Sequence, residues 1–237
     1  IYKFFHQINP VADLSIMENG FDDLEAIIRH PNVWYFRQFL QNLSVSTLTE
    51  IEKYSMIRIC ELNFLGRHPT PIRLRAMWGL HAFNKTISES YLNDPNEHIR
   101  AWLIRLMMDD QPIDTLFGPR EKALPTISPE IMQKLVQQAI MDASGLVRLT
   151  LASTLQRLPV ESRGELAKAL AFRSEDINDH NLPLVVWAGI TPLVELDPEK
   201  VLDVARSTEW SNLRTWIARA VTERSKENPV MFDALLK

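Results

Sequence analysis

One short pattern recurs along this chain and restricts the folds open to it. Each copy places a turn residue, then an aliphatic residue followed by an arginine, and then an apolar segment. In the two clearest copies Asp94 stands six residues before Arg100, and Asp142 stands six residues before Arg148. The looser copies carry, at the same place, Arg37, Arg75, Arg214 and, instead of an arginine, Pro183. A unit that recurs in this way predicts a repeat architecture.

The repeated unit has the chemistry of two helices joined by a turn. Aspartate or asparagine caps the amides at the start of a helix, and proline is tolerated in a first helical turn. After the turn, Ile99, Trp102, Leu103 and Leu106 follow the spacing of an amphipathic helix. A second stripe of this kind consists of Leu213, Trp216, Ile217 and Ala220. Successive copies lie 25 to 48 residues apart, around the roughly 40-residue period of HEAT-type repeats. We therefore expect an all-α fold, an α-solenoid of HEAT or armadillo type.

Glycine scarcity favours the same fold. Seven of the 237 residues are glycine, about 3%, against roughly 7% in average proteins. Sheet-rich domains use glycine in hairpin turns and bulges, and nucleotide-binding loops use it where the backbone approaches phosphate. Because the seven glycines never cluster, the sequence also predicts that no phosphate-binding loop is present.

Four segments are expected along the chain. Residues 1–22 form a non-repetitive lead-in, 23–109 the N-terminal repeats, 110–128 an irregular connection containing prolines, and 129–237 the C-terminal repeats. The connection is either an insertion that lies over the array or the seam between two halves. Helices are expected near residues 23–30, 33–43, 47–65, 71–83, 86–93, 97–109, 129–142, 146–157, 161–172, 183–190, 198–206, 211–226 and 229–236. The start lacks an initiator methionine and a signal-peptide pattern, which suggests a processed chain or a piece of a longer protein.

The charge balance argues against nucleic acid as a partner. The chain holds 26 basic and 30 acidic residues, so no excess of positive charge exists to attract a phosphate backbone. The longest apolar stretch, residues 182–196, is shorter than the roughly 20 residues of a membrane-spanning helix and is interrupted by Pro183, Pro192 and Glu195. No membrane span is predicted. The single cysteine, Cys60, is expected to be a small buried side chain rather than a reactive thiol.

Two polar segments are candidates for a loop or interaction site. Asp179, His180 and Asn181 precede an apolar helix in an oxygen-rich loop. The spacing does not fit an EF-hand calcium loop, so capping of the helix is the favoured interpretation. Asp109 and Asp110 are interpreted as a polar helix end, with a general acid–base pair as the alternative. None of the six histidines has metal-ligand spacing, so we expect no catalytic residue, no metal and no cofactor in this chain.

The arginines and turn aspartates of the repeat are expected to be structural. Each arginine should pair with the turn aspartate of its own or a neighbouring repeat and so fix how repeats stack. The residues concerned are Arg37, Arg75, Asp94, Arg100, Asp142, Arg148 and Arg214. Five of the six tryptophans lie close to the arginine position, so packing between repeats is favoured over stacking on a ligand. These five are Trp34, Trp78, Trp102, Trp187 and Trp216.

Several strings of the sequence resemble a known family. They run over residues 30–35, 74–81, 94–102, 147–159 and 179–184, and the Asp-His-Asn-Leu-Pro string that begins at Asp179 is the most specific of them. Together they resemble the HEAT-like helical region of bacterial "membrane-bound dehydrogenase domain" proteins, or PVC-type haem-binding CxxCH proteins. Such chains are similar in plan: an exported N-terminal β-propeller like that of sugar dehydrogenases, a HEAT-like middle region, and often a cytochrome-c-like domain.

The resemblance implies a setting for this chain rather than an activity. It implies an exported, periplasmic or membrane-associated parent protein, with haem c in another domain, and it transfers no catalytic residue to this region. The expected function is therefore a non-catalytic repeat module that acts as a scaffold or as a docking surface for a protein or for neighbouring domains of the same parent. The alternative is that the loops around Asp179 and Asp109 complete a dehydrogenase-type oxidoreductase site whose propeller and haem domains lie outside this chain.

Overall fold

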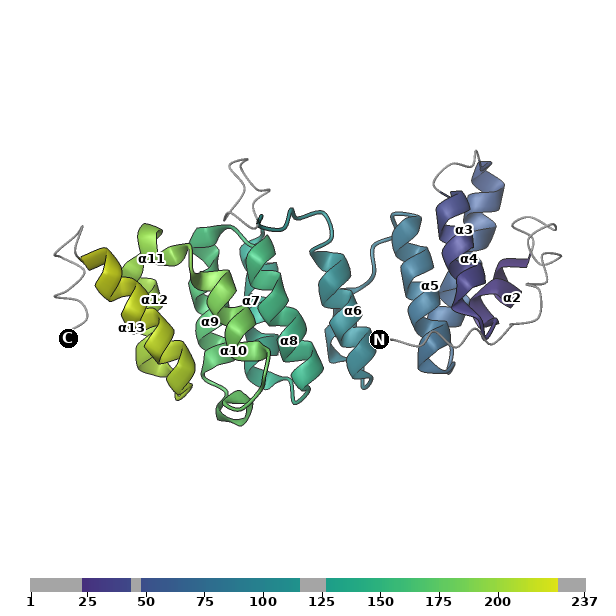
Figure 1. Ribbon diagram of the computed structural model, residues 1–237. Helices are drawn as coiled ribbons and strands as arrows, with labels where there is room; N and C mark the ends of the chain where they lie inside the picture. The colour runs from purple at the N-terminus through teal and green to yellow at the C-terminus, as the bar shows by residue number, and fades with distance from the viewer. Residues whose placement is uncertain (1–22, 44–47, 116–126, 226–237) are drawn as a thin grey trace, which may run out of the picture. The chain divides into compact units, whose positions relative to one another are not determined.

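The computed structural model describes residues 23–43, 48–115 and 127–225, and over these ranges the protein is built from helices alone (Figure 1). Twelve α-helices and four short 3₁₀ helices are present in the described residues, and no strand is found there. The prediction of an all-α fold is confirmed. The chain divides into two compact units, residues 1–88 and residues 89–237.

The first unit contains a long helical hairpin and two further helices. Its α-helices are α2 (Leu24–Arg29), α3 (Val33–Leu43), α4 (Glu50–Leu65) and α5 (Thr70–Ala82). A capping box starts α4: the Glu52 amide donates to Thr49 Oγ1, and the Thr49 amide donates to the Glu52 carboxylate. α4 packs along α5, and α2 contacts α3, α4 and α5. This packing buries the apolar side chains of α2, including Leu24, Ile27 and Ile28.

The hairpin of α4 and α5 depends on a close approach between Cys60 and Gly79. A Cβ atom added at Gly79 would lie 2.7 Å from Cys60 Sγ, closer than packed atoms come, so only glycine fits there without a shift. Cys60 is fully buried, and this burial raises the pKa of its thiol to about 12. The expectation of a small buried side chain at Cys60 is therefore confirmed.

The second unit contains two rows of helices. One row is formed by α6 (Glu97–Met107), α8 (Gly145–Thr154), α10 (Leu182–Ile190) and α13 (Ser211–Ser225), in which each helix contacts the next. The other row is formed by α7 (Pro129–Met141), α9 (Arg163–Ala171) and α12 (Pro198–Ser207). Short helices complete the unit: η2 (Glu89–Asn93), η3 (Leu155–Arg157), η4 (Val160–Ser162), η5 (Ser174–Asp176) and α11 (Leu193–Leu196). The rows contact each other through the pairs α7–α8, α8–α9, α9–α10 and α12–α13.

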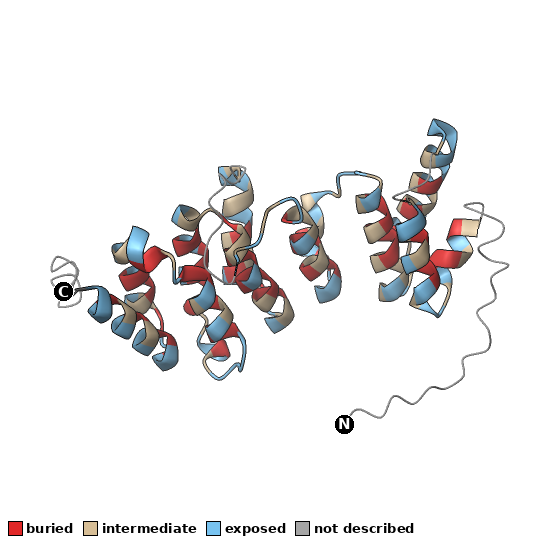
Figure 2. Ribbon diagram, turned by 45° about the horizontal axis from the view of Figure 1, so that its top comes forward, coloured by how far each residue is buried: buried red, intermediate tan, exposed pale blue. Residues whose placement is uncertain are grey.

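The core of the second unit lies between these rows. Buried side chains recur every fourth residue along the helices of the first row, as in Leu182, Val186 and Ile190 of α10. α13 has the same ridge, formed by Leu213, Ile217 and Val221. Figure 2 shows the buried residues on the inner sides of the helices and the exposed residues on their outer sides. Ridges with this spacing are the surfaces through which packed helices interdigitate.

The observed boundaries differ from the expected ones in a few places. The helix expected at 86–93 is reduced to the 3₁₀ helix η2, and α11 was not expected. The 229–236 helix, the 1–22 lead-in and residues 116–126 of the irregular connection lie outside the described residues. The division after Ser88 places α6 in the second unit. Among the helices described, none is long and apolar enough to cross a membrane.

Candidate functional site

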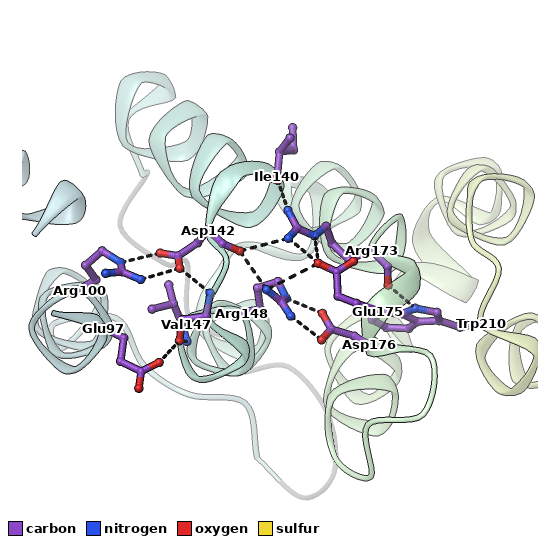
Figure 3. A network of polar contacts seen from close by, with 11 residues as sticks. Glu97, Arg100, Ile140, Asp142, Val147, Arg148, Arg173, Glu175, Asp176 and Trp210 are labelled. Atoms are coloured by element: carbon purple, nitrogen blue, oxygen red, sulfur yellow. Dashed lines mark hydrogen bonds and ion pairs between the residues drawn. The ribbon is translucent and has the colours of Figure 1, made fainter. Parts of the chain in front are cut away.

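A row of charged contacts joins the turns that precede α6, α8 and α10. We call it the Arg–Asp ladder and define it as Asp94, Arg100, Asp142, Arg148 and Asp176. Figure 3 shows the last four of these residues. The turn aspartates come from three successive turns along one edge of the unit, and the arginines come from the first turns of α6 and α8. The ladder therefore connects helices that are neighbours in the first row.

The ladder has two rungs, the ion pair of Arg100 with Asp142 and that of Arg148 with Asp176. In both rungs the arginine makes the same three contacts. Arg100 donates from Nε and Nη2 to the two carboxylate oxygens of Asp142, each at 2.7 Å, and from Nη1 to the carbonyl oxygen of Asp94 at 2.8 Å. Arg148 donates from Nε and Nη2 to the carboxylate of Asp176 at 2.5 and 2.6 Å, and from Nη1 to the carbonyl oxygen of Asp142 at 2.9 Å. Each arginine thus binds its own turn through a carbonyl and the following turn through a bidentate ion pair.

The turn aspartates also hold their own turns in shape. Asp94 Oδ1 accepts from the Asn96 amide at 2.9 Å, and Asp142 Oδ1 accepts from the Ser144 amide at 2.8 Å. In the turn before α13, Thr208 Oγ1 plays this part by accepting from the Trp210 amide at 3.1 Å. Aspartate and threonine both form turns of this kind with the amide two residues on. In each turn, one side chain therefore accepts a hydrogen bond that holds the turn in shape. The side chain of Asp142 also forms the ion pair with Arg100.

Burial makes the first rung a strong contact. The side chain of Asp142 is 1% exposed and that of Arg100 is 14% exposed. Burial by itself would raise the pKa of Asp142, but hydrogen bonds from Arg100, from the Ser144 amide and from Gln138 outweigh it and hold this pKa below its ordinary value. The hydrogen bonds to Asp142 and Asp176 raise the pKa of Arg100 and of Arg148. These contacts therefore favour the charged forms of Asp142, Arg100 and Arg148.

A third buried ion pair lies at the opposite edge of the unit and was missed by the sequence analysis. Arg163, which is fully buried at the start of α9, donates from Nη1 and Nη2 to the carboxylate of Asp114 at 2.7 and 2.9 Å. It also donates to the carbonyl oxygens of Leu158 and Gly189, each at 2.9 Å. These contacts fasten the start of the irregular connection to α9, to α10 and to the residue that follows η3.

The other predicted repeat arginines lie elsewhere. Arg75 is buried and donates to the carbonyl oxygens of Ile28 and His30, which ties α5 to the turn between α2 and α3 without an aspartate. Burial lowers the pKa of Arg75. Arg37 and Arg214 are exposed. Only Arg100 and Arg148, of the five predicted, form an ion pair with a turn aspartate in the described residues.

One candidate polar segment lies at the start of α10, and the other follows the end of α6. Asp179 Oδ1 accepts from the amides of Asn181 and Leu182 at 2.8 and 2.7 Å, so it caps the start of α10, while His180 and Asn181 are exposed. Asp109 and Asp110 are exposed beyond the last turn of α6. The structure therefore does not bring the two segments together into one site.

Two hollows lie along α10 and α13, and the second of them extends to α11. The first, of about 350 Å³, is lined among others by Asp179, Leu184 and Trp216. The second, of about 730 Å³, is lined among others by Trp187 and Glu223. Between them the rings of Trp187 and Trp216 meet with their centroids 6.5 Å apart. We call this region, defined by Asp179, Leu184, Trp187, Trp216, Ala220 and Glu223, the α10–α13 surface.

Neither metal chemistry nor a known relative identifies the site. No group of three or more His, Cys, Asp or Glu side chains that could hold a metal ion occurs within residues 23–43, 48–115 and 127–225. Comparison of the chain with protein-family models, with curated proteins and with solved structures finds no match. The function has to be inferred from the arrangement of the chain's own residues.

Proposed function

We propose that this chain is an α-solenoid of HEAT or armadillo type that acts as a non-catalytic scaffold or docking surface for another protein or domain. The observation that carries the proposal is the Arg–Asp ladder. The same three arginine contacts recur at two successive turns, with the same six-residue spacing inside each turn. Recurrence of both spacing and contact supports units that stack on their neighbours by one rule, which is the defining property of a helical repeat array.

The chemistry of the ladder supports a structural role for its charged groups. The carboxylate of Asp142 accepts four hydrogen bonds, from Arg100 twice, from the Ser144 amide and from Gln138, so its capacity to bind a substrate is already used. Arg148 is equally occupied by Asp176 and by a carbonyl oxygen. Helical repeat arrays commonly use the extended surfaces that stacking creates to bind proteins.

Exposed apolar side chains in the second unit support docking. Met141 is 72% exposed, Phe172 71% and Leu184 49%, and each is a side chain of the size that interfaces usually bury. The proposed setting, a longer exported bacterial protein with a propeller and a haem domain, rests on the sequence strings alone. The gene sequence on either side of residues 1 and 237 tests it: a propeller upstream and a CxxCH motif downstream would support that setting, and a gene that encodes only these residues would refute it.

Docking itself can be tested with the purified chain. The full chain is immobilised and incubated with an extract of its source cells, and each captured protein is identified, purified and titrated against the chain in solution. We expect at least one purified protein to bind with a measurable Kd. Failure of every purified candidate to bind would refute the docking function. An absorbance spectrum with a Soret band, or a stoichiometric metal content of the purified chain, would refute its description as a module without chemistry of its own.

A further inference from the structure

The α10–α13 surface has the composition of a peptide-binding site. Its centre is apolar: Leu184 is 49% exposed, and Trp187 and Trp216 are half-buried and in contact with each other. A hollow lies on each side of this contact, one toward the start of the two helices and one toward their ends. Tryptophan is enriched at the centres of protein interfaces because it combines a large apolar area with a polar edge.

Negative charge flanks this apolar centre on both sides. Asp179 lines the first hollow, and the second hollow contains Glu195, Glu223 and Arg224. Arg224 forms an ion pair with Glu195, so Glu223 sets the net charge of the second hollow. Among the Asp, Glu and Arg side chains that line the two hollows, each hollow thus has one carboxylate in excess, and His180 also lines the first hollow. Such an arrangement favours a ligand that carries a positive charge at each end.

The spacing of the two carboxylates defines the length of that ligand. Asn212 lines the first hollow with Asp179, and Glu223 lies eleven residues further along α13. Eleven residues of α-helix rise about 17 Å, and an extended chain covers this distance in about five residues. Successive side chains of an extended chain point to opposite faces, so two side chains face the same surface only when they stand an even number of positions apart. Two basic residues six positions apart, about 20 Å, would therefore reach both ends, with the residues between them over Trp187 and Trp216.

We propose that the α10–α13 surface binds an extended segment of a partner protein in which two basic residues stand six positions apart and two apolar residues occupy the second and fourth positions after the first basic residue, so that all four side chains lie on one face. The inference rests on the proposed docking function and names its surface and the class of partner. The apolar residues would fill the hollows beside the tryptophan contact, and the basic residues would face Asp179 and Glu223. Positive charge is also favoured beside the indole rings.

A titration with synthetic peptides tests the inference directly. The probe is an acetylated and amidated heptapeptide, Lys-Ser-Leu-Ser-Leu-Ser-Lys, and the controls are Glu-Ser-Leu-Ser-Leu-Ser-Glu and Lys-Ser-Ser-Ser-Ser-Ser-Lys. Tryptophan fluorescence of the full chain reports binding, because the peptides contain no tryptophan. We expect the probe to bind at least ~10-fold more tightly than either control, with an affinity that falls as salt is added. Equal binding of all three peptides, or no binding of the probe, would overturn the inference.

Two surface variants locate the binding. Glu223→Lys reverses one flanking charge, and Leu184→Ser removes part of the apolar centre; both residues are exposed, so the fold should persist. Each should weaken probe binding by about 10-fold. The matched control is Glu165→Lys, the same charge change at an exposed position on α9 in the other row, which should leave the affinity unchanged. Equal effects of Glu223→Lys and Glu165→Lys would overturn the proposed site.

The same variants separate this inference from the proposed function. If an identified partner binds the chain but is insensitive to Glu223→Lys and Leu184→Ser, the docking function stands and the α10–α13 surface is the wrong site. If no purified partner binds at all, the docking function fails as well. A dimer in sedimentation that Leu184→Ser dissociates would identify a second copy of this chain as the occupant and would also overturn the inference.

Discussion

Replacing Asp142 with asparagine tests how much the Arg–Asp ladder stabilises the second unit. The carboxylate is 1% exposed and receives Arg100, itself 14% exposed, through two hydrogen bonds of 2.7 Å. Removing one partner of a buried ion pair costs about 3–5 kcal/mol, because the other charge stays buried without compensation. Arg100 retains its bond to the Asp94 carbonyl oxygen, so we expect the lower end of this range, about 3 kcal/mol. For a chain of this size, that corresponds to a fall in Tm of roughly 6–12 °C.

The control for this prediction is an exposed ion pair of the same unit. Asp203 pairs with Lys168 at 2.6 Å, but their side chains are 53% and 46% exposed. Exposed pairs contribute about 0–1 kcal/mol, so Asp203→Asn should change the stability by less than about 1 kcal/mol. Urea denaturation followed by circular dichroism measures both variants, and an unchanged m-value shows that the midpoints report stability. Equal costs for Asp142→Asn and Asp203→Asn would refute the reasoning.

A double variant checks that the cost comes from the pair. Arg100→Gln and Asp142→Asn each leave one charge behind, whereas the double variant leaves none. The combined cost should therefore be smaller than the sum of the two single costs by about 0.5–3 kcal/mol. Additive costs would mean that Arg100 and Asp142 contribute independently, for example through the Asp142 bond to the Ser144 amide.

The same carboxylate predicts how stability depends on pH. The pKa of Asp142 is lowered from its ordinary value of 3.8 in the folded chain, so the unfolded chain binds a proton more readily there. Its contribution is fully present above the unfolded pKa and is lost as pH falls through the lower folded pKa. The urea midpoint of the natural chain should therefore fall below about pH 4, and it should fall less steeply in Asp142→Asn. Identical pH profiles for the two proteins would contradict this assignment.

Three further predictions concern other parts of the chain. Arg163→Met leaves the carboxylate of Asp114, which is 10% exposed, without its bidentate partner. The free energy of unfolding in urea should fall by about 3–5 kcal/mol, and a fall of less than about 1 kcal/mol would disprove that Arg163 anchors the irregular connection. Asp179→Ala removes the acceptor of two amides at the start of α10 and should lower the free energy of unfolding by about 1 kcal/mol. His180→Ala, at an exposed position, should change the free energy of unfolding by less than about 0.5 kcal/mol in thermal denaturation. Equal losses for the two variants would contradict the capping role of Asp179. Cys60, buried and with a pKa of about 12, should react with a thiol reagent only as fast as the first unit opens, and immediate labelling at mildly alkaline pH would contradict this.

Most helices could be predicted because their signals are local. Capping residues and the spacing of apolar side chains lie within one helix, and they placed α3 at Val33–Leu43 as observed. The face that each helix buries was harder to predict. Trp216 was expected in the apolar stripe of α13, but the buried ridge consists of Leu213, Ile217 and Val221, and Trp216 is only half-buried. Which side of an amphipathic stripe is covered depends on the neighbouring helices, and no local pattern records this.

The charged contacts show the same limit. The repeat spacing predicted that Arg148 would pair with a turn aspartate, but it did not predict Asp176 as that aspartate. In the copy of the pattern that carries Pro183, the sequence instead indicates Asp179 as the turn aspartate. Neither a local helix pattern nor the repeat spacing indicates the pair of Arg163 and Asp114. The two residues belong to no repeated string and lie 49 positions apart. Ion pairs between residues far apart in the sequence can be identified only when the packing of the two rows of helices is known.

The end of the ladder has a consequence for the proposed binding surface. At the place of Arg100 and Arg148 the next copy of the pattern has Pro183, which has no guanidinium group, so within the described residues the ladder stops at Asp176. α10 and α13 are joined instead by their apolar ridges and by the contact of Trp187 with Trp216. Asp179 uses one carboxylate oxygen for the amides at the start of α10, and its charge faces the first hollow. The copy of the pattern in which Pro183 stands at the arginine position therefore also contains Asp179, the carboxylate that attracts a basic residue in the proposed binding mode.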